Sequence, residues 1–481
     1  MPEKSRYDAV IIGSGPNGLA AAITLLKAKK RVLIVEAKES AGGGMRTGEL
    51  TLPGFQHDIC SAIHPLGIAS PFFRSLPLSN YGLKWIYAPA SLCHPLDNGQ
   101  AALLVNSVGE TAKTLREDSE RYRRLIEPLL SRWRLILPEI LAPFHIPRHP
   151  FALLRFGLSA IQSAVKFSKR KFNSPLTRGF FAGLAAHSIV PLEEPITAAF
   201  ALVLGILGHS AGWPMPEGGS QSIALALTSY IKSLGGEFLL DTKINNLDEL
   251  PHSDIVLFDL TPKQILAIAG ERFPKGYRRQ LERYRYGPGV FKMDFAVNSP
   301  VPFKSPECTM SAVVHLGGTM EEIACSEEEV WKGNHPESPF VILAQQSLFD
   351  STRAPKGNHT VWAYCHVPNG SEADMSERII SQIERFAPGF RATILSSHKM
   401  NTHNFQAYNN NYIGGDINGG VQNWRQLFTR PTLKLTPYRT PLKGVYICSS
   451  STPPGGGVHG MCGYYAAKTA LRDIYRIKAV L

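Results

Sequence analysis

The stretch Tyr7-Asp-Ala-Val-Ile-Ile-Gly13-Ser-Gly15-Pro-Asn-Gly18 decides the fold class of this 481-residue chain. A short apolar strand leads into glycines spaced Gly-x-Gly-x-x-Gly, and an apolar helix follows over residues 19–28. In such a turn the first glycine permits the tight bend, the second lets the backbone approach a pyrophosphate, and the third lets the helix pack closely on the strand. The helix N-terminus then faces the phosphates with unpaired N–H groups. This spacing predicts a Rossmann-type α/β unit that binds a dinucleotide.

A second strand and a carboxylate strengthen this prediction. The second strand, over residues 31–35 and apolar from Val32 on, ends at Glu36. This acid lies 18 residues after Gly18, where a carboxylate accepts hydrogen bonds from ribose hydroxyls. A glycine turn in another kind of α/β protein would not explain Glu36. We therefore expect dinucleotide binding.

Two further glycine-rich segments extend the expected site. Gly42-Gly43-Gly44-Met45-Arg46 comes where an ordinary NAD-binding domain continues into a crossover helix. Its glycines let the backbone lie against a ligand, and Arg46 supplies a cation for a phosphate or a flavin edge. Near the other end of the chain, a strand over 444–448 leads into Ser449-Ser-Ser-Thr-Pro-Pro-Gly-Gly-Gly-Val-His-Gly-Met461 and a helix over 462–475. The start of that helix favours negative charge.

These blocks, together with Met215-Pro-Glu-Gly-Gly219 and Gly414-Gly-Asp-Ile-Asn-Gly-Gly420, stand in an order that resembles the phytoene desaturase-like proteins of the flavin amine oxidase superfamily. The resemblance covers essentially the whole chain and implies FAD as the cofactor. Gly44 stands where the carotenoid enzymes have an arginine, and His459 where they have a proline. These two departures argue against a carotenoid as the substrate of this chain, and they do not affect the expectation of FAD binding.

The resemblance also implies where FAD is held. In the family, backbone near Ile244 touches the adenine, and the C-terminal loop and helix close over the ribityl chain and the flavin pyrimidine. The expected FAD contacts are Gly13, Ser14, Gly15, Pro16, Asn17, Gly18, Glu36, Ala37, Gly42, Gly43, Gly44, Met45, Arg46, Ser61, Ala62, Ile244, Ser450, Gly460 and Met461.

We divide the chain into three parts. Residues 1–110, 215–262 and 425–481 form a discontinuous Rossmann-type FAD-binding domain, which includes an expected strand over 237–247. Residues 263–424 form a substrate-binding domain. Its apolar residues alternate over 287–368, which predicts a mixed, mostly antiparallel sheet, the floor of the substrate cavity in the resembling family. Residues 111–214 are helical, and the apolar run 196–208 predicts a helix that is buried or lines an apolar cavity.

The net charge of +12 is concentrated in part of the helical segment. Residues 128–190 hold nine basic side chains and one acid, Glu139. Aromatic and aliphatic residues lie among them, so we expect an apolar surface and no nucleic-acid partner. Over residues 151–172, helical spacing gathers the polar and basic side chains in one sector. Such a helix either lies at an anionic membrane interface or packs as a lid on its own domain.

His459 and His64 are the candidate catalytic residues, since a histidine can take a substrate proton while hydride leaves to the flavin. The alternative is that each only hydrogen-bonds the flavin or a backbone carbonyl. No histidines, cysteines or acids have the spacing of metal ligands, so we expect no metal.

The seven cysteines show no CxxC pair, the start MPEKSRYDAVIIG has no apolar leader, and the run 196–208 is too short to cross a bilayer. We expect a cytoplasmic protein, with peripheral membrane contact as the alternative; no oligomeric state is predicted.

The function that follows is an FAD-dependent oxidoreductase, a dehydrogenase, desaturase or oxidase that takes hydride from a lipophilic small molecule onto flavin N5. Two alternatives stay open. One is a flavin-dependent isomerase without net redox chemistry, and the other is a non-enzymatic lipid-binding or escort protein of the same fold.

Overall fold

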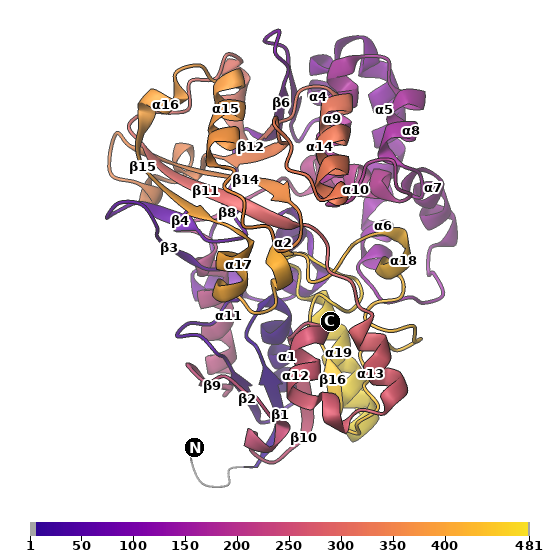
Figure 1. Ribbon diagram of the computed structural model, residues 1–481. Coiled ribbons are helices and arrows are strands. Elements are labelled where there is room, and N and C mark those ends of the chain that lie inside the picture. Colours follow the sequence, from indigo (N-terminus) through magenta and orange to yellow (C-terminus); the bar gives the residue numbers. More distant parts are fainter. Residues whose placement is uncertain (1–5, 480–481) are drawn as a thin grey trace.

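The computed structural model describes residues 6–479 (Figure 1). The glycine loop at residues 13–18 lies at the carboxyl end of the central strand of a five-stranded parallel sheet. The strand order is β16-β10-β1-β2-β9. The sheet therefore contains strands from both ends of the chain and from its middle. The bounds are β1 (Tyr7–Ile12), β2 (Val32–Val35), β9 (Glu237–Leu239), β10 (Ser253–Phe258) and β16 (Val445–Ile447). Residues 1–5 lie outside the described residues. They are part of the N-terminal segment in which the sequence predicts no apolar leader.

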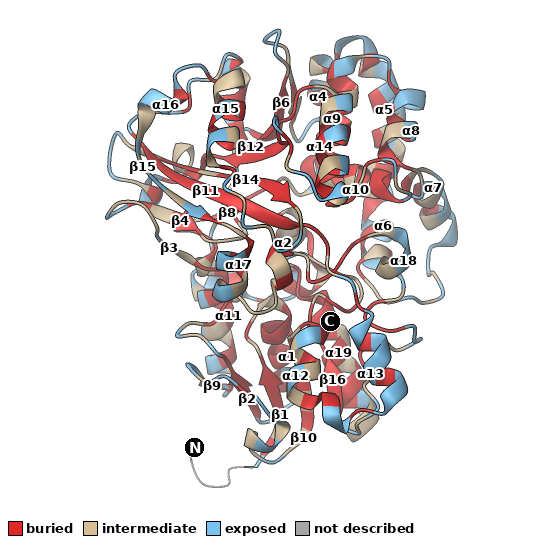
Figure 2. Cartoon of the chain, in the orientation of Figure 1, coloured by how far each residue is buried: buried red, intermediate tan, exposed pale blue. Residues whose placement is uncertain are grey.

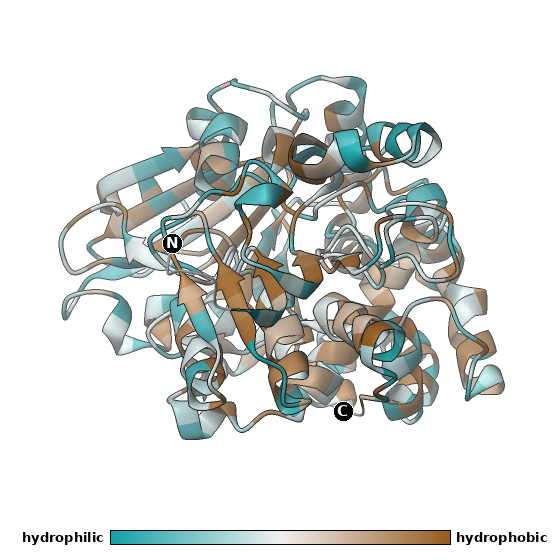
Figure 3. Ribbon diagram, turned by 90° about the horizontal axis from the view of Figure 1, so that it is seen from below, coloured by the Kyte–Doolittle hydropathy of each residue, from teal (hydrophilic) through white to brown (hydrophobic). Residues whose placement is uncertain are grey.

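Helices cover both faces of this sheet, and its strands are apolar on both sides (Figures 2 and 3). Along β1, Ala9 and Ile11 pack in the core beneath α1 (Pro16–Lys27), α11 (Gln221–Ser233) and α19 (Met461–Ala470). Val10 and Ile12 pack on the opposite side, against α12 (Pro262–Ala269) and α13 (Lys275–Glu282). Burial on both faces explains the continuous apolar runs of these strands.

A second sheet has seven strands in the order β15-β11-β14-β13-β12-β6-β7. All pairs are antiparallel except β12 with β6, so the sheet is mixed, as the sequence predicts. The strands β6 and β7 come from the range 1–110 but pair in this second sheet. The bounds are β6 (Ala90–Pro95), β7 (Ala101–Leu104), β11 (Gly289–Val297), β12 (Ser311–Leu316), β13 (Val341–Ala344), β14 (His359–Val367) and β15 (Ile394–Met400).

The helical segment begins with α4 (Val108–Thr114), α5 (Ser119–Leu130) and α6 (Trp133–Ile140) and ends with α9 (Pro175–Ala186) and α10 (Thr197–Ser210). The expectation of one helix over 151–172 was wrong. The chain forms α7 (Pro150–Ala160) and α8 (Ala164–Lys171), because the Ser163 side chain caps a new helix by accepting from the Lys166 N–H.

The expected strand over 237–247 was also wrong beyond Leu239. Asp241 adopts a left-handed backbone conformation with φ 50°, which ends the extended run. The Asp241 and Thr242 N–H groups donate to the carbonyls of Lys38 and Glu36 at 3.1 and 2.9 Å. The chain is thereby turned across the end of β2, and this turn carries Ile244 to the cavity described below.

The remaining elements are short or flank the second sheet. They are β3 (Thr47–Glu49), β4 (Gln56–Asp58), α2 (Pro65–Ala69), α3 (Pro71–Arg74), β5 (Trp85–Ile86), β8 (Met215–Pro216), α14 (Met320–Lys332), α15 (Ser376–Phe386), α16 (Phe390–Thr393), α17 (Thr402–Tyr408) and α18 (Trp424–Leu427). Within residues 6–479, no helix combines the length and apolar character needed to cross a membrane. The seven cysteines, all in this range, are free thiols.

Candidate functional site

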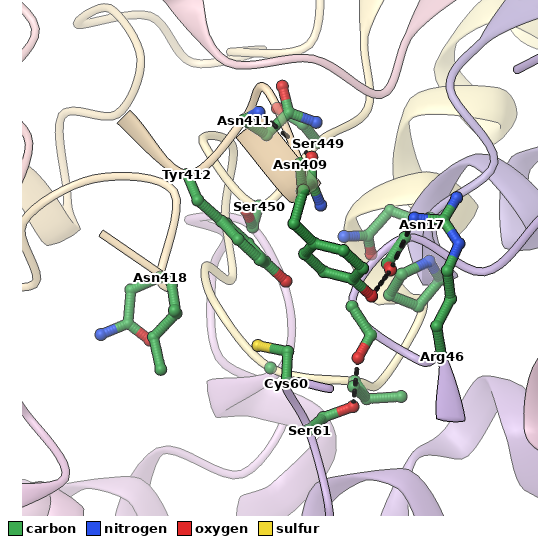
Figure 4. Close-up of a pocket in the computed structure, with 18 of the residues that line it drawn as sticks. Asn17, Arg46, Cys60, Ser61, Asn409, Asn411, Tyr412, Asn418, Ser449 and Ser450 are labelled. Carbon is green, nitrogen blue, oxygen red and sulfur yellow. Dashed lines mark hydrogen bonds between the residues drawn. The ribbon is translucent and has the colours of Figure 1, made fainter. Parts of the chain in front are cut away.

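A single cavity runs from the carboxyl ends of the parallel strands to the face of the second sheet. Figure 4 shows part of its lining, around Arg46, Tyr412 and Ser450. At one end the cavity is lined by Val35, Glu36 and Ile244, and in the middle by the glycine loops. Ligands bind at this edge in open α/β sheets, because the strand ends and helix N-termini meet there. Most of the expected FAD contacts therefore converge on one space.

Glu36 ties the glycine loop to the second strand. Its Oε2 atom accepts hydrogen bonds from the Ser14 N–H at 3.0 Å and the Ser14 hydroxyl at 2.5 Å, and Oε1 accepts from the Lys38 N–H at 3.0 Å. The Arg46 guanidinium lies 3.6 Å from Oε1. The carboxylate thus faces the cavity at the position expected to receive ribose hydroxyls.

Asp259, directly after β10, is a site residue that sequence reasoning missed. Its Oδ2 atom accepts from the Gly18 N–H at 2.9 Å, and a Cβ placed on Gly15 would lie 2.6 Å from that oxygen. Burial raises the pKa of Asp259 to about 7, and the nearby Glu36 carboxylate adds to this rise. The sequence signal was an acid at the end of an apolar run, but only the pairing of β10 with β1 places it under the glycine loop.

The second glycine segment packs directly against the first. A Cβ on Gly43 would lie 2.9 Å from the Gly15 Cα, and the Gly42 N–H donates to the Ser14 carbonyl at 3.0 Å. Arg46 is held by hydrogen bonds to the carbonyls of Ser40, at 2.6 Å, and Gly43, at 3.3 Å. Its guanidinium lines the cavity beside both loops, where it can meet a phosphate.

Residues 408–412 close the cavity from the side of the second sheet, and sequence reasoning missed them too. The Tyr408 hydroxyl donates to the Gly43 carbonyl at 2.7 Å. The Asn411 amide donates to the Asp259 carbonyl at 3.0 Å and accepts from the Thr261 N–H at 2.9 Å. No motif marks this segment, because its partners lie about 150 residues or more away in sequence.

The C-terminal loop supplies another wall through Ser449, Ser450 and Gly457. His459 lies behind this wall and not in it. Its Nδ1 atom accepts from the Met461 N–H at 3.0 Å, and Nε2 lies 3.2 Å from the Gly455 carbonyl. Burial lowers the pKa of His459 to about 4, so the ring is neutral at neutral pH. This geometry matches the alternative in which the histidine only hydrogen-bonds the backbone.

His64 lines the cavity with its imidazole buried. Its Nε2 atom lies 2.8 Å from the Ser220 hydroxyl, which donates to the Ser61 carbonyl at 2.5 Å. Burial lowers the pKa of His64 to about 4. A neutral ring held by Ser220 positions the loop after β4.

Beyond the glycine loops the cavity widens into a mainly apolar space, here called the apolar chamber. Its lining residues are His187, Ile189, Leu204, Trp213, Val290, Lys292, Val313, Ile342, Trp362 and Tyr364. Among these described residues, Lys292 is the one lysine or arginine. Sequence reasoning missed Lys292 as well, because strands with alternating apolar residues usually expose their other face, whereas β11 is buried along its whole length.

The expected contacts divide into two groups. Those that line the cavity are Gly13, Ser14, Gly15, Pro16, Asn17, Glu36, Ala37, Gly43, Gly44, Arg46, Ser61, Ala62, Ile244, Ser450 and His64. Those that lie behind its walls are Gly18, Gly42, Met45, His459, Gly460 and Met461. Gly18 shows why, since a Cβ there would lie 2.2 Å from the Gly13 carbonyl oxygen. Within residues 6–479, no group of three histidines, cysteines or acids is placed to hold a metal.

The fold and this arrangement are similar to those of flavin-type oxidoreductases of the amine oxidase and desaturase kind. The family model "NAD(P)-binding Rossmann-like domain" matches residues 11–76. The wild-type putrescine oxidase bound to putrescine superposes with a TM-score of 0.62 at 16% identity, covering 98% of this chain and 100% of its own. An oxidoreductase from Methanosarcina mazei reaches 0.66 at 16% identity, covering 97% of this chain and 100% of its own.

Three curated relatives match along nearly the whole chain. Pyridine nucleotide-disulfide oxidoreductase domain-containing protein 2 of Rattus norvegicus is 24% identical over 98% of this chain and 94% of its own. A limonene dehydrogenase polypeptide of Castellaniella defragrans is 21% identical, covering 98% of this chain and 96% of its own. The lycopene-forming phytoene desaturase of a Paracoccus species is 20% identical, covering 95% of each. These homologues confirm the predicted resemblance to phytoene desaturase-like oxidoreductases.

Proposed function

We propose that this chain binds FAD and oxidises a lipophilic small molecule in the apolar chamber. The observation that carries the proposal is the continuity of the cavity, which joins Glu36 at one end to Trp362 at the other. An elongated dinucleotide along the glycine loops would place its far end at the mouth of the chamber.

The residues present fit FAD. Glu36 faces the ribose position, the loops at Gly13 and Gly43 leave no side chain in the phosphate position, and Arg46 offers a cation beside them. Asn17, the second residue of α1, has a buried side-chain oxygen without a partner. The N-cap residue of α1 is a glycine, which has no side chain to cap the helix. The positive end of the helix faces the cavity beside Pro16 and Asn17 and favours a pyrophosphate there.

When bound, FAD supplies the acceptor for a hydride from the substrate. The chain's own residues bind and orient that substrate. Trp213, Trp362 and Tyr364 give the chamber large apolar walls that exclude water and hold an apolar molecule by burial. Such walls offer few partners for a strongly polar substrate, which favours a lipophilic one.

Lys292 is the residue placed to handle a proton. Its ammonium donates to the Asp294 carboxylate, and Nζ lies 6.0 Å from the centre of the Trp362 ring. Oxidation by hydride loss leaves a proton to be removed. Lys292 would pass one of its own protons to the Asp294 carboxylate and take up the substrate's proton at the Nζ atom that this frees. His64 and His459 have buried, neutral rings held by other residues, so they are weaker candidates for this role.

The test is an anaerobic screen of extracted lipids against the purified, FAD-loaded protein. We expect one lipid fraction to bleach the flavin absorption and to yield a product lighter by two hydrogens. A product of unchanged mass would instead support the isomerase alternative. If every fraction binds without bleaching or conversion, the protein is a lipid-binding escort and the proposal is wrong.

A further inference from the structure

The surface around α6 and α7 exposes large apolar side chains to solvent. Phe144, Ile146 and Phe151 are 82, 91 and 86% exposed, and Leu154 and Leu158 are about 60% exposed. Folded chains usually cover groups of this size, and a contiguous set of them marks an interaction surface. The side chains on the opposite side of α7, Ala152, Phe156 and Ala160, are buried, so the helix is firmly packed while this apolar face stays uncovered.

A second exposed apolar segment lies beside the first, although it is far away in sequence. Trp424 and Phe428 in and after α18, and Leu433 and Leu435 after them, are 44–85% exposed. Leu435 and Pro143 line the same groove, together with Lys468 of α19. We call these residues the apolar face; its members are Phe144, Ile146, Phe151, Leu154, Leu158, Trp424, Phe428, Leu433 and Leu435.

Cations surround the apolar face. The exposed ones are Arg134, Arg148, Arg155, Arg425, Arg472 and Lys478. Burial and the repulsion of nearby Arg148 and Arg472 lower the pKa of Lys468 in the groove, which agrees with a positive potential there. This positive charge selects for an anionic partner.

Two acids near this surface are already paired. Glu139 is the one acid between residues 128 and 190, and it accepts from the His145 ring at 2.7 Å and from the Arg148 N–H at 3.1 Å. Asp473 is paired with Arg439 at 2.6 Å. No acid lies between residues 424 and 443.

We propose that the apolar face docks on an anionic lipid bilayer. Protruding aromatic and aliphatic side chains insert among acyl chains, and the cations around them meet lipid phosphates. A nucleic acid would leave the apolar side chains in water, and a second copy of this face would bring like charges together. A bilayer with anionic headgroups covers the apolar side chains and also pairs with the cations around them.

This docking also has a consequence that rests on the proposed function. Helix α10 packs against α7, while Leu204 of α10 lines the apolar chamber. One helix therefore separates the chamber from the docked surface. A lipophilic substrate dissolved in the bilayer would have a short route to the site.

The test is sedimentation of the full chain with vesicles of phosphatidylcholine alone or mixed with phosphatidylglycerol. We expect binding to the mixed vesicles that weakens with added salt. The variant F144S/I146S/F151S should bind at least about tenfold more weakly, because three inserting side chains are lost. The variant R148E/R155E should lose the preference for phosphatidylglycerol. The controls are L225S/L395S, exposed apolar residues elsewhere, and K27E/K232E, exposed cations elsewhere. Both should bind like the unaltered protein.

Undiminished binding of both face variants, with unchanged melting temperatures, would overturn the proposal. So would a concentration-dependent oligomer that F144S/I146S/F151S dissociates, since a second copy would then cover the face. Flavin content is measured on the same samples. If vesicle binding is lost while flavin is retained, the proposed function stands. If the protein binds vesicles but holds no flavin, the proposed function is refuted and the docking proposal stands.

Discussion

The ammonium of Lys292 donates a hydrogen bond to the carboxylate of Asp294, two residues further along β11, and both side chains are buried. Burial alone would raise the pKa of Asp294, but Lys292, His398 and His57 outweigh it and lower the pKa below its usual value. The pair therefore stays charged inside the protein, next to the apolar chamber. A buried ion pair of this kind is costly to form, so we interpret it as functional and not as a source of stability.

Replacing Lys292 with Met should slow anaerobic flavin reduction by about 10²–10⁴-fold, the usual contribution of a positioned acid or base. K292M alone also leaves Asp294 charged and unpaired, at a cost of about 3–5 kcal/mol in the free energy of unfolding. The double variant K292M/D294N removes both charges and should recover the melting temperature but not the rate. Rapid-mixing spectroscopy and thermal melts separate the two effects. A double variant that recovers full rate would show that the pair is only structural.

Asp259 should make the protein less stable as the pH rises. Because the folded-state pKa of this carboxyl is about 7 and the unfolded value is near 3.8, the folded chain holds a proton that the unfolded chain loses. The stability that this carboxyl contributes is fully present below about pH 4, and it is lost as the pH rises to about 7. The difference in unfolding free energy should be a few kcal/mol.

Thermal melts of the unaltered protein and D259N between pH 4 and 8 check this. The isosteric amide does not titrate, so the D259N curve should fall less over this interval. Parallel curves for the two proteins would mean that Asp259 is ionised throughout.

Gly18→Ala should disrupt FAD binding. The added Cβ would lie 2.2 Å from the Gly13 carbonyl oxygen, so α1 must move away from the glycine loop. We expect a loss of about 1–3 kcal/mol in stability and a low flavin content after purification. Gly276→Ala in α13 is the matched control, because nothing lies within 4 Å of its Cβ position. Normal flavin content in G18A would refute the close contact.

His459→Gln should lower flavin retention without changing the shape of the pH–rate profile between pH 5 and 8. The ring bridges the Met461 N–H and the Gly455 carbonyl, and its pKa of about 4 lies below that interval. Rates measured at a series of pH values with FAD in excess provide the check. A profile that loses an ionisation in H459Q would restore this histidine as a catalytic candidate.

The sequence sufficed for the parts of the site that are local in the chain. The glycine loop, α1, β2 and Glu36 form one continuous unit, so spacing alone predicts their geometry. The Gly42 segment and the C-terminal loop followed from resemblance. Their contact with the first loop, such as that between Gly43 and Gly15, is visible only in the structure.

The residues that were missed share a physical reason. Asp259 and Asn411 acquire their roles from partners far away in the sequence. Lys292 lies in a strand that pairs with β14, about 70 residues later, which no local pattern shows. Likewise β6 joins the second sheet because it pairs with β12, more than 200 residues later. The break between α7 and α8 depends on one capping serine, which helical periodicity does not detect.

The most direct test of FAD binding is the absorption spectrum of the purified protein, followed by mass spectrometry of the cofactor released on denaturation. We predict a yellow protein with flavin absorption bands that releases about one FAD per chain, or takes up one when FAD is added. A colourless protein that does not take up FAD, and binds NAD or NADP at the glycine loop instead, would contradict the central claim.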